Sequence, residues 1–246
     1  MGEMNLIIDI GNTATKLAVF QAGKLKNAQT VATTVLGAEV EKLLAIFPKI
    51  KQGILSSVVK LETSDVNLLQ KLLPIKVLVP TFKMPFENRY DTPQTLGVDR
   101  LALMAAAVKH FPNKNILVID AGTCITYDFL DAQQQYLGGA ISPGLNMRYK
   151  SLNTFTSRLP LVSPKVPEAL VGTSTEASIH SGIVHGVLLE IEGAIESYQN
   201  KYSDLTVILT GGDADFLCKQ FKISIFAHSN FLLEGLNFLL EFNSNE

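Results

Sequence analysis

Two short stretches of the chain carry residue types suited to holding phosphate. In each, an apolar run ends at an Asp, a Gly follows two residues later, and a hydroxyl residue comes just after it. The residues are Asp9, Gly11 and Thr13 in NLIIDIGNTATKLAVF, and Asp120, Gly122 and Thr123 in ILVIDAGTCITYDFL. Glycine lets a ligand approach the main chain, turn N–H groups face anionic oxygens, and a carboxylate can hold a metal ion or its waters. One copy alone is equally typical of an ordinary β-hairpin, but the repetition favours two loops that grip a polyphosphate between two domains.

A third glycine-containing turn lies in TVILTGGDADFL, where an apolar strand ends and a helix begins. Gly211 and Gly212 would let the main chain lie against a flat base or ribose. The N-terminus of the following helix offers free N–H groups and the positive end of its dipole. Taken alone, the segment is typical of a tight strand-to-helix turn. Beside the two phosphate loops, it predicts the adenosine side of a nucleotide site.

Strands and helices alternate around these turns. Strands are expected over 5–10, 15–20 and 24–34, and a second three-stranded meander over about 115–142. Helices are expected in AEVEKLLAIF, SDVNLLQKLL, VDRLALMAAAVKHF, NMRYKSLNTF, ADFLCKQF and FLLEGLNFLLEF, and a long one over about 174–202. Further strands are expected in GILSSV, KVLVP, LTVILT and ISIFA, and a Pro-containing irregular segment over 80–95. This order predicts an α/β fold with parallel pairing after the opening meander.

Composition narrows the classes of function. The 246 residues have 47% apolar and 18% charged content and a formal net charge of −2, which is typical of a globular chain with an ample core. No Lys- or Arg-rich run predicts nucleic-acid binding, and the terminal apolar helix is too short to span a bilayer. Cys124 and Cys218 do not resemble a disulfide framework, and nothing resembles a signal peptide. We therefore expect a cytoplasmic protein that binds neither nucleic acid nor membrane.

The order of the three glycine turns resembles the superfamily of acetate kinase, sugar kinases, heat-shock protein and actin. Within it, DIGNTATK, YDTPQTLGVDRLALMAAA, DAGT, GGAISPG and GTSTEASIHSG together resemble type III pantothenate kinases over essentially the whole chain. The resemblance implies two similar ribonuclease H-like halves, as in actin-like ATPases, with a cleft between them. The halves are expected to be residues 1–112 and 113–246. The implied activity is ATP-dependent phosphorylation of pantothenate to 4′-phosphopantothenate, the first step of coenzyme A biosynthesis.

The resemblance also assigns the first loop to ATP. The residues that match the ATP-binding motif are Asp9, Ile10, Gly11, Asn12, Thr13, Ala14, Thr15 and Lys16. Asp9 is implied to hold magnesium, through water, because that ion keeps several waters and prefers few carboxylates. Lys16 lies beyond the tight part of the motif, so it could contact the nucleotide or simply begin a strand with a solvated charge.

The segment Gly97-Val98-Asp99-Arg100 resembles the family's substrate motif, although a small residue is usual where Val98 stands. Asp99 is the implied catalytic base, because an Asp can orient the acceptor hydroxyl and take its proton. From spacing alone, Asp99 would be interpreted as a helix cap. Arg100 is implied to neutralise the substrate carboxylate or the transferring phosphoryl group, since its planar fork of donors suits either.

Four more positions carry implied roles. Tyr90 matches a tyrosine that contacts pantothenate. Thr175 matches a threonine on the pantothenate side, although Thr173 and Ser174 are hard to tell from it. Asp120 is implied to bind a monovalent cation, potassium or ammonium, and Thr123 to contact ATP. The resemblance further implies a homodimer, with the helix over about 174–202 at its interface. The alternatives are another small-molecule kinase of the superfamily, or a nucleotide-binding transcriptional accessory protein without kinase activity.

Overall fold

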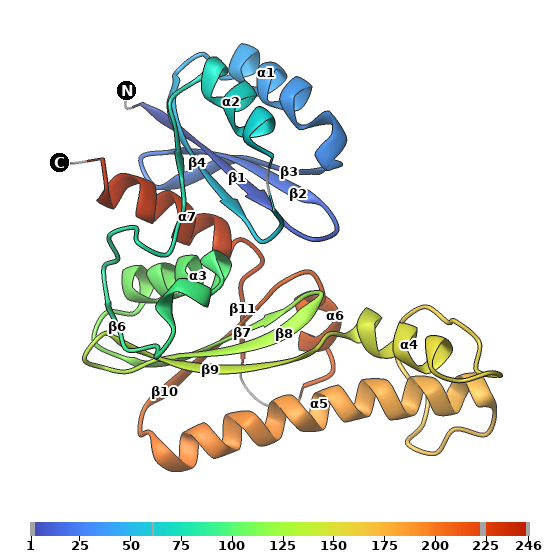
Figure 1. The fold of residues 1–246 in the computed structure, drawn as a ribbon. Helices are drawn as coiled ribbons and strands as arrows, with labels where there is room; N and C mark the ends of the chain where they lie inside the picture. The colour runs from blue at the N-terminus through green and yellow to red at the C-terminus, as the bar shows by residue number, and fades with distance from the viewer. Residues whose placement is uncertain (1–2, 61, 222–224, 245–246) are drawn as a thin grey trace. The chain divides into compact units, whose positions relative to one another are not determined.

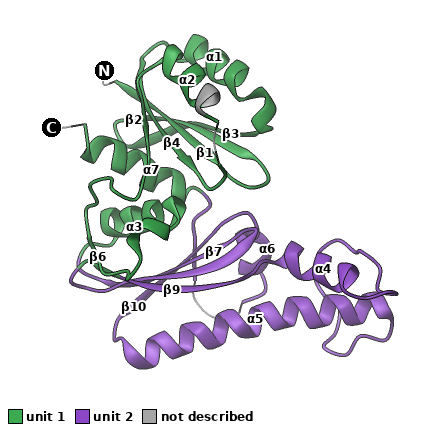
Figure 2. Ribbon diagram, viewed as in Figure 1, with its two compact units in different colours: residues 1–112, 134–136, 230–246 green, residues 113–133, 137–229 purple. Residues whose placement is uncertain are grey.

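The computed structural model describes residues 3–60, 62–221 and 225–244 of the chain. Contacts divide the chain into two compact units (Figure 2). Unit 1 comprises residues 1–112, 134–136 and 230–246, and unit 2 comprises residues 113–133 and 137–229. The contacts thus group the residues differently from a single division at residue 112. The C-terminal helix and three residues of the second meander belong to unit 1.

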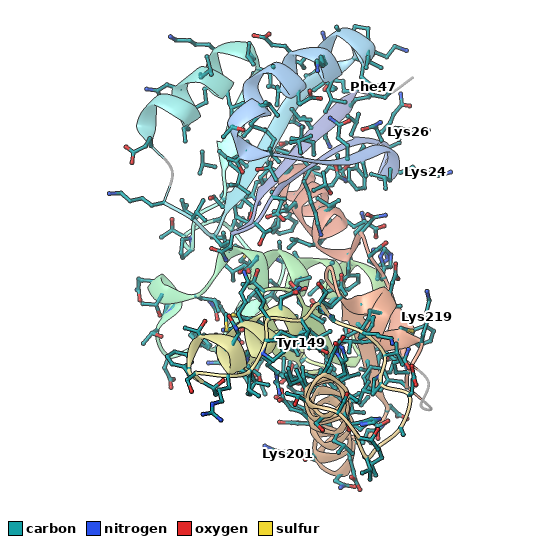
Figure 3. All side chains as sticks on the ribbon, turned by 90° about the vertical axis from the view of Figure 1, so that its right-hand side faces the viewer. Lys24, Lys26, Phe47, Tyr149, Lys201 and Lys219 are labelled. Atoms are coloured by element: carbon teal, nitrogen blue, oxygen red, sulfur yellow. The ribbon has the colours of Figure 1, made fainter. Side chains whose placement is uncertain are left out.

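Unit 1 is built on a mixed sheet. Its strands are β1 (Met4–Ile10), β2 (Thr15–Gln21), β3 (Lys24–Val31), β4 (Ile50–Ser57) and β5 (Ile75–Val77), in the order β3-β2-β1-β4-β5. The first three strands form an antiparallel meander, and β4 and β5 add to β1 in parallel. Lys24 and Lys26 are exposed on the edge strand β3 (Figure 3). Charged side chains on an edge strand discourage pairing with another sheet.

Both faces of this sheet are covered by helices (Figure 1). The helices are α1 (Leu36–Ile46), α2 (Thr63–Leu72), α3 (Val98–His110) and α7 (Phe231–Phe242). Successive side chains of a strand point to opposite faces, and β1 is apolar on both. Leu6 and Ile8 pack in one core with α1 and α2. On β1, Asn5 binds Asn237 of α7, with 2.9 Å between Nδ2 and Oδ1.

Unit 2 contains a second sheet with a similar opening meander. Its strands are β7 (Asn115–Ala121), β8 (Cys124–Leu130), β9 (Gln135–Pro143), β10 (Leu205–Thr210) and β11 (Phe226–Ala227). The order is β11-β10-β7-β8-β9, with β7 antiparallel to β8 and parallel to β10. The first residues of β9, which belong to unit 1, pair with the short strand β6 (Glu87–Asn88).

The long helix α5 (Thr175–Lys201) packs along the sheet of unit 2 (Figure 1). It is accompanied by α4 (Leu145–Thr154) and by the short helix α6 (Ala214–Cys218). Tyr149 of α4 lies close to α5 (Figure 3), with its hydroxyl 2.8 Å from Nδ1 of His180. No helix of the described ranges is both long enough and apolar enough to span a membrane.

The predicted α/β fold is confirmed, and most predicted elements lie within a few residues of the observed ones. The terminal helix occupies the expected 231–242. Helix α6 is shorter than expected and ends at Cys218. The strand expected in ISIFA is described only as Phe226–Ala227, because residues 222–224 lie outside the described ranges. Strand β6 and the 3-10 turns Thr33–Val35 and Pro93–Thr95 have no apolar periodicity and were not predicted.

Candidate active site

The first phosphate loop occupies the gap between β1 and β2. Residues Gly11 to Ala14 separate the strands, and Gly11 N–H donates a hydrogen bond to the Ala14 carbonyl at 3.1 Å. Asn12 and Thr13 are exposed at the tip. Their side chains and the turn N–H groups are therefore accessible to an anion. Ile10 is buried, and the buried Thr15 has its hydroxyl 2.9 Å from that of Thr33.

Asp9 is the ionisable group of this loop, and it is only 7% exposed. Its strand neighbours are Lys16 on β2 and Ser56 on β4. Burial raises the pKa of Asp9 to about 6, although the Lys16 charge and the Ser56 hydroxyl lower it, while the nearby Asp99 charge raises it. A buried carboxyl group has an unfavourable free energy of ionisation, and a nearby cation stabilises its ionised form. The Lys16 charge therefore favours the ionised form of Asp9.

Asp99 lies in the first turn of α3, on the same unit as Asp9. Its Oδ1 accepts a hydrogen bond from the Arg100 N–H at 2.8 Å. A Cβ on Gly97 would collide with that same oxygen, so glycine is needed for the Asp99 side chain to fold back over the helix start. Val98 is buried, while Asp99 is partly exposed. The GVDR segment thus presents one carboxylate at the positive end of a helix.

Tyr90 and Arg100 lie together on unit 1. The guanidinium carbon of Arg100 is 5.5 Å from the centre of the Tyr90 ring, which is close enough for a cation–π interaction. Arg100 is only 5% exposed, and Tyr90 is half-buried. Tyr90 N–H also donates to Asn88 Oδ1 at 3.0 Å, which fixes the main chain beside the ring. The structure therefore brings Tyr90 next to the GVDR segment, as the resemblance implies.

The second phosphate loop is shorter. Only Gly122 and Thr123 separate β7 from β8, and Gly122 N–H donates to the Cys124 carbonyl at 2.9 Å. Thr123 is exposed. Asp120 is partly buried near the end of β7. The predicted residues Asp120 and Thr123 therefore lie at one end of the unit 2 sheet.

Two further glycine turns press on this loop. Gly144 N–H donates to the Thr123 carbonyl at 3.1 Å, and a Cβ on Gly144 would collide with main-chain oxygens of the loop. Gly211 has a φ of +98°, and its Cβ would collide with the Ala121 carbonyl and the Asp120 carboxylate. A Cβ on Gly212 would meet nothing, which leaves the open space expected beside a nucleoside.

A polar cluster on unit 2 supports the turn that carries Gly144. Arg148 donates to the Pro143 carbonyl at 2.8 Å and to Ser142 Oγ at 2.9 Å, and it pairs with Glu190 of α5 at 2.5 Å. Tyr127 donates to the other Glu190 oxygen at 2.8 Å. Burial raises the pKa of Glu190, but these hydrogen bonds outweigh it, so the pKa lies below its usual value. Glu190 is therefore an anion that fixes Arg148 and, through it, the turn.

Thr175 is the first residue of α5 and is exposed. Ser174 caps the helix by accepting a hydrogen bond from Ala177 N–H at 3.1 Å, which leaves the Thr175 hydroxyl outside the cap. Thr175 belongs to unit 2, whereas Tyr90 and Asp99 belong to unit 1.

Each of the two loops has one carboxylate near it, Asp9 at the first and Asp120 at the second. Among residues 3–60, 62–221 and 225–244, no three His, Cys, Asp or Glu side chains gather in a metal-binding group. Asp9 has a pKa raised by burial and lies beside main-chain N–H groups that suit phosphate. The Asp120 carboxylate and the Ala121 carbonyl both lie beside Gly211, since a Cβ on Gly211 would collide with each of them.

Three residues of the site escaped sequence reasoning. Ser56 is the strand partner of Asp9 and its hydroxyl lowers the pKa of that carboxyl, Gly144 contacts the second loop, and Tyr136 lies against Tyr90. A signal existed for Ser56, because it ends an apolar strand that was expected to pair in parallel. Gly144 ends the family motif GGAISPG, but nothing in the spacing of that motif indicates which loop Gly144 contacts.

Comparison with known proteins places the chain in a family. The family model described as type III pantothenate kinase matches residues 5–197. The chain belongs to the type III pantothenate kinase family. It is 53% identical to the type III pantothenate kinase of Christiangramia forsetii, over 99% of this chain and 100% of that protein. It is 46% identical to that of Flavobacterium johnsoniae, over 95% and 96% of the two chains.

Solved structures support the actin-like kinase fold of this family. One is a Campylobacter jejuni protein named for the Baf family of transcriptional activators. It has a TM-score of 0.65 at 23% identity, with 98% of this chain and 100% of that chain covered. A glucokinase from an Antarctic psychrotroph has a TM-score of 0.55 at 13% identity, over 98% and 100% of the chains. At these identities the likeness concerns the fold alone.

Proposed function

We infer that this protein uses ATP to phosphorylate pantothenate to 4′-phosphopantothenate, which opens coenzyme A biosynthesis. The inference rests on the GVDR segment of this type III pantothenate kinase chain. In that segment Asp99 lies at the start of α3, near enough for its charge to raise the pKa of Asp9. Phosphoryl transfer needs little covalent help from the protein. It needs an aligned acceptor and stabilisation of charge on the transferring group.

Asp99 is proposed as the catalytic base. Asp99 is partly exposed, and its Oδ1 accepts a hydrogen bond from Arg100 N–H at 2.8 Å. That bond orients the side chain, and a carboxylate held at this place can accept the hydroxyl proton of pantothenate. Gly97 is part of the same design, because any larger residue would displace the carboxylate.

Tyr90, Arg100 and Thr175 are proposed to bind pantothenate. The buried Arg100 guanidinium lies over the Tyr90 ring, and its planar fork of donors suits the carboxylate of pantothenate or the transferring phosphoryl group. Thr175 offers an exposed hydroxyl at the beginning of α5. Gly97 and Val98 contribute main-chain groups rather than side chains.

The two phosphate loops are proposed to bind ATP, Asp9 to Lys16 in unit 1 and Thr123 in unit 2. We propose that Asp9 holds magnesium through water, which would supply charge neutralisation on the phosphates when bound. We propose that Asp120 holds potassium or ammonium beside the second loop. Lys16 keeps Asp9 more acidic than burial alone would allow.

We further propose a cytoplasmic homodimer with α5 at its interface. Apolar side chains are exposed on this helix and on the segment before it, including Phe155 at 84%, Leu170 at 74%, Val171 at 75% and Leu189 at 66%. Exposed apolar groups of this kind favour burial against another chain. Leu189→Glu should yield monomers in light scattering. Ile46→Glu on α1, also 66% exposed, is the matched control that should leave the dimer intact.

The function is tested with purified protein, magnesium, labelled ATP and a choice of acceptors. Pantothenate should yield a labelled phosphate ester, and glucose and acetate should not. Labelled glucose phosphate or acetyl phosphate without labelled pantothenate would replace the proposal with another kinase of the superfamily. Binding of ATP with no transfer to any acceptor would favour the non-catalytic accessory role.

A further inference from the structure

Tyr136 belongs to unit 1 although the residues before Gln134 and after Tyr136 belong to unit 2. Gln135 and Tyr136 open β9 and pair with β6, which ends two residues before Tyr90. Two main-chain hydrogen bonds join the segments. Glu87 N–H donates to the Gln134 carbonyl at 2.9 Å, and Arg89 N–H donates to the Tyr136 carbonyl at 3.0 Å. The Tyr136 ring therefore has a fixed place relative to the Tyr90 main chain.

The side chains of Phe86, Tyr136, Tyr90 and Arg100 lie against one another in that order, and we call this set the column. Tyr136 is fully buried, and its ring is stacked on that of Tyr90 with 6.1 Å between centres and 14° between planes. Phe86 meets Tyr136 edge-on at 6.2 Å and 71°. Arg100 lies over Tyr90 at 5.5 Å. Offset stacking and edge-to-face contact are the favoured geometries for such pairs.

We propose that Tyr136 is a positioning residue that sets the Tyr90 ring, and through it the Arg100 guanidinium, for binding the acceptor substrate. The proposal rests on the pantothenate role proposed for Tyr90 and Arg100. Tyr90 is half-buried and lies in an irregular segment, so its own strand does not fix its ring. The flat face of Tyr136 supplies that constraint. A short, flexible substrate gains most from a site whose groups are already in place.

A purely structural role would also explain a buried tyrosine, so the test must separate position from stability. Tyr136→Leu keeps an apolar side chain but removes the flat face, and Tyr136→Phe keeps the ring. Phe129→Leu is the matched control in unit 2, because Phe129 is 2% exposed and its ring lies 4.1 Å from that of Tyr202. It should cost comparable stability without touching the column.

Steady-state kinetics with both substrates give the readout, beside thermal unfolding of each variant. Tyr136→Leu should raise KM for pantothenate by about tenfold, since small misplacements of positioning groups cost up to about a hundredfold. KM for ATP should stay within about twofold, and kcat should fall less than KM rises. Tyr136→Phe should restore the pantothenate KM, and Phe129→Leu should lower only the unfolding temperature.

An unchanged pantothenate KM in Tyr136→Leu overturns the proposal, as does a Tyr136→Phe variant that behaves like Tyr136→Leu. If Tyr136→Leu does not fold, Phe86→Leu loosens the column from its other side and should raise the same KM by a smaller factor, with no rise counting against the proposal. Tyr90→Leu separates this inference from the proposed function. If it leaves the pantothenate KM unchanged, the substrate role of Tyr90 fails first. If Tyr90→Leu raises it and Tyr136→Leu does not, only the positioning role fails.

Discussion

The two phosphate loops share one sequence signature but differ in length and surroundings. Residues Gly11 to Ala14 form the first, whereas only Gly122 and Thr123 form the second. The first borders ionisable groups, because the charges of Lys16 and Asp99 both act on the pKa of Asp9. The second is crowded by main chain, with Gly144 and Gly211 pressed against it.

This difference indicates how a repeated unit acquires two roles. The shared Asp and Gly give both loops a main chain that suits phosphate. We propose that the charged neighbours of the first loop set the protonation of Asp9 and suit that loop to a metal ion. We propose that the close-packed glycine turns hold the second loop in place for the nucleotide. Substitutions in and around each loop test this division.

Asp99→Asn should have the largest effect on turnover. The amide keeps the shape of the side chain but cannot accept the hydroxyl proton, so kcat should fall by about 10²–10⁴-fold. ATP binding, measured by calorimetry, should change little, because the base touches the acceptor. Near-wild-type turnover with pantothenate would eliminate Asp99 as the base, and lost ATP binding would contradict the separation of roles.

Asp9→Asn should reveal the electrostatic character of the first loop in the pH dependence of stability. The folded pKa of Asp9 is about 6 and the usual value is 3.8, so the folded state binds this proton more tightly than the unfolded state. The contribution of Asp9 to the free energy of unfolding is therefore fully present below pH about 4 and is lost as the pH rises through 6. Relative to wild type, the variant should gain up to about 3 kcal/mol of unfolding free energy between these limits.

Urea unfolding of both proteins from pH 4 to 8, without nucleotide or magnesium, checks this sign. A constant difference across the range would contradict it. Ser56→Ala is the companion variant. Its lost hydroxyl should raise the pKa of Asp9 further, so its stability should fall more steeply with pH than that of wild type.

Gly144→Ala should disturb the second loop much more than Gly11→Ala disturbs the first. The new methyl on Gly144 would collide with carbonyl oxygens of Gly122 and Thr123, whereas on Gly11 it would lie 3.2 Å from the Ala14 carbonyl. Overpacking of this kind costs about 1–3 kcal/mol, and the loop must shift to relieve it. KM for ATP should rise about tenfold in Gly144→Ala, as 1.4 kcal/mol corresponds to a factor of ten.

Gly122→Ala is the stability control, because its Cβ would be 3.9 Å from the nearest atom outside its neighbours. Its unfolding temperature should match that of wild type, while that of Gly144→Ala should drop by several degrees. Equal unfolding temperatures for the two variants would show that crowding does not distinguish the second loop.

The sequence was sufficient for what depends on local pattern. Both loops follow from an apolar strand that ends in Asp and Gly, and the terminal helix 231–242 follows from its apolar periodicity. What could not be predicted depends on contacts between distant residues. Where that helix packs on unit 1, Asn237 meets Asn5, a pairing across the whole chain that no local pattern indicates. Tyr136 is likewise brought to Tyr90 by a strand pair only two residues long.

Asp120→Ala should give the smallest effect and the sharpest contrast with the first loop. We propose that Asp120 holds a monovalent cation, which needs a carboxylate among carbonyl oxygens rather than several charged ligands. Wild-type activity should then fall when potassium is replaced by sodium or a large organic cation. The variant should lose roughly tenfold or less in kcat/KM for ATP, because one ligand contributes only part of such a site. The activity of the variant should also respond less to the change of salt.

Asp9→Ala provides the comparison, since its remaining activity should depend on magnesium and still respond to potassium. If both variants respond to potassium and magnesium in the same way, the two carboxylates do not have separate roles. If wild type is equally active in all these salts, the monovalent cation has no part in the mechanism.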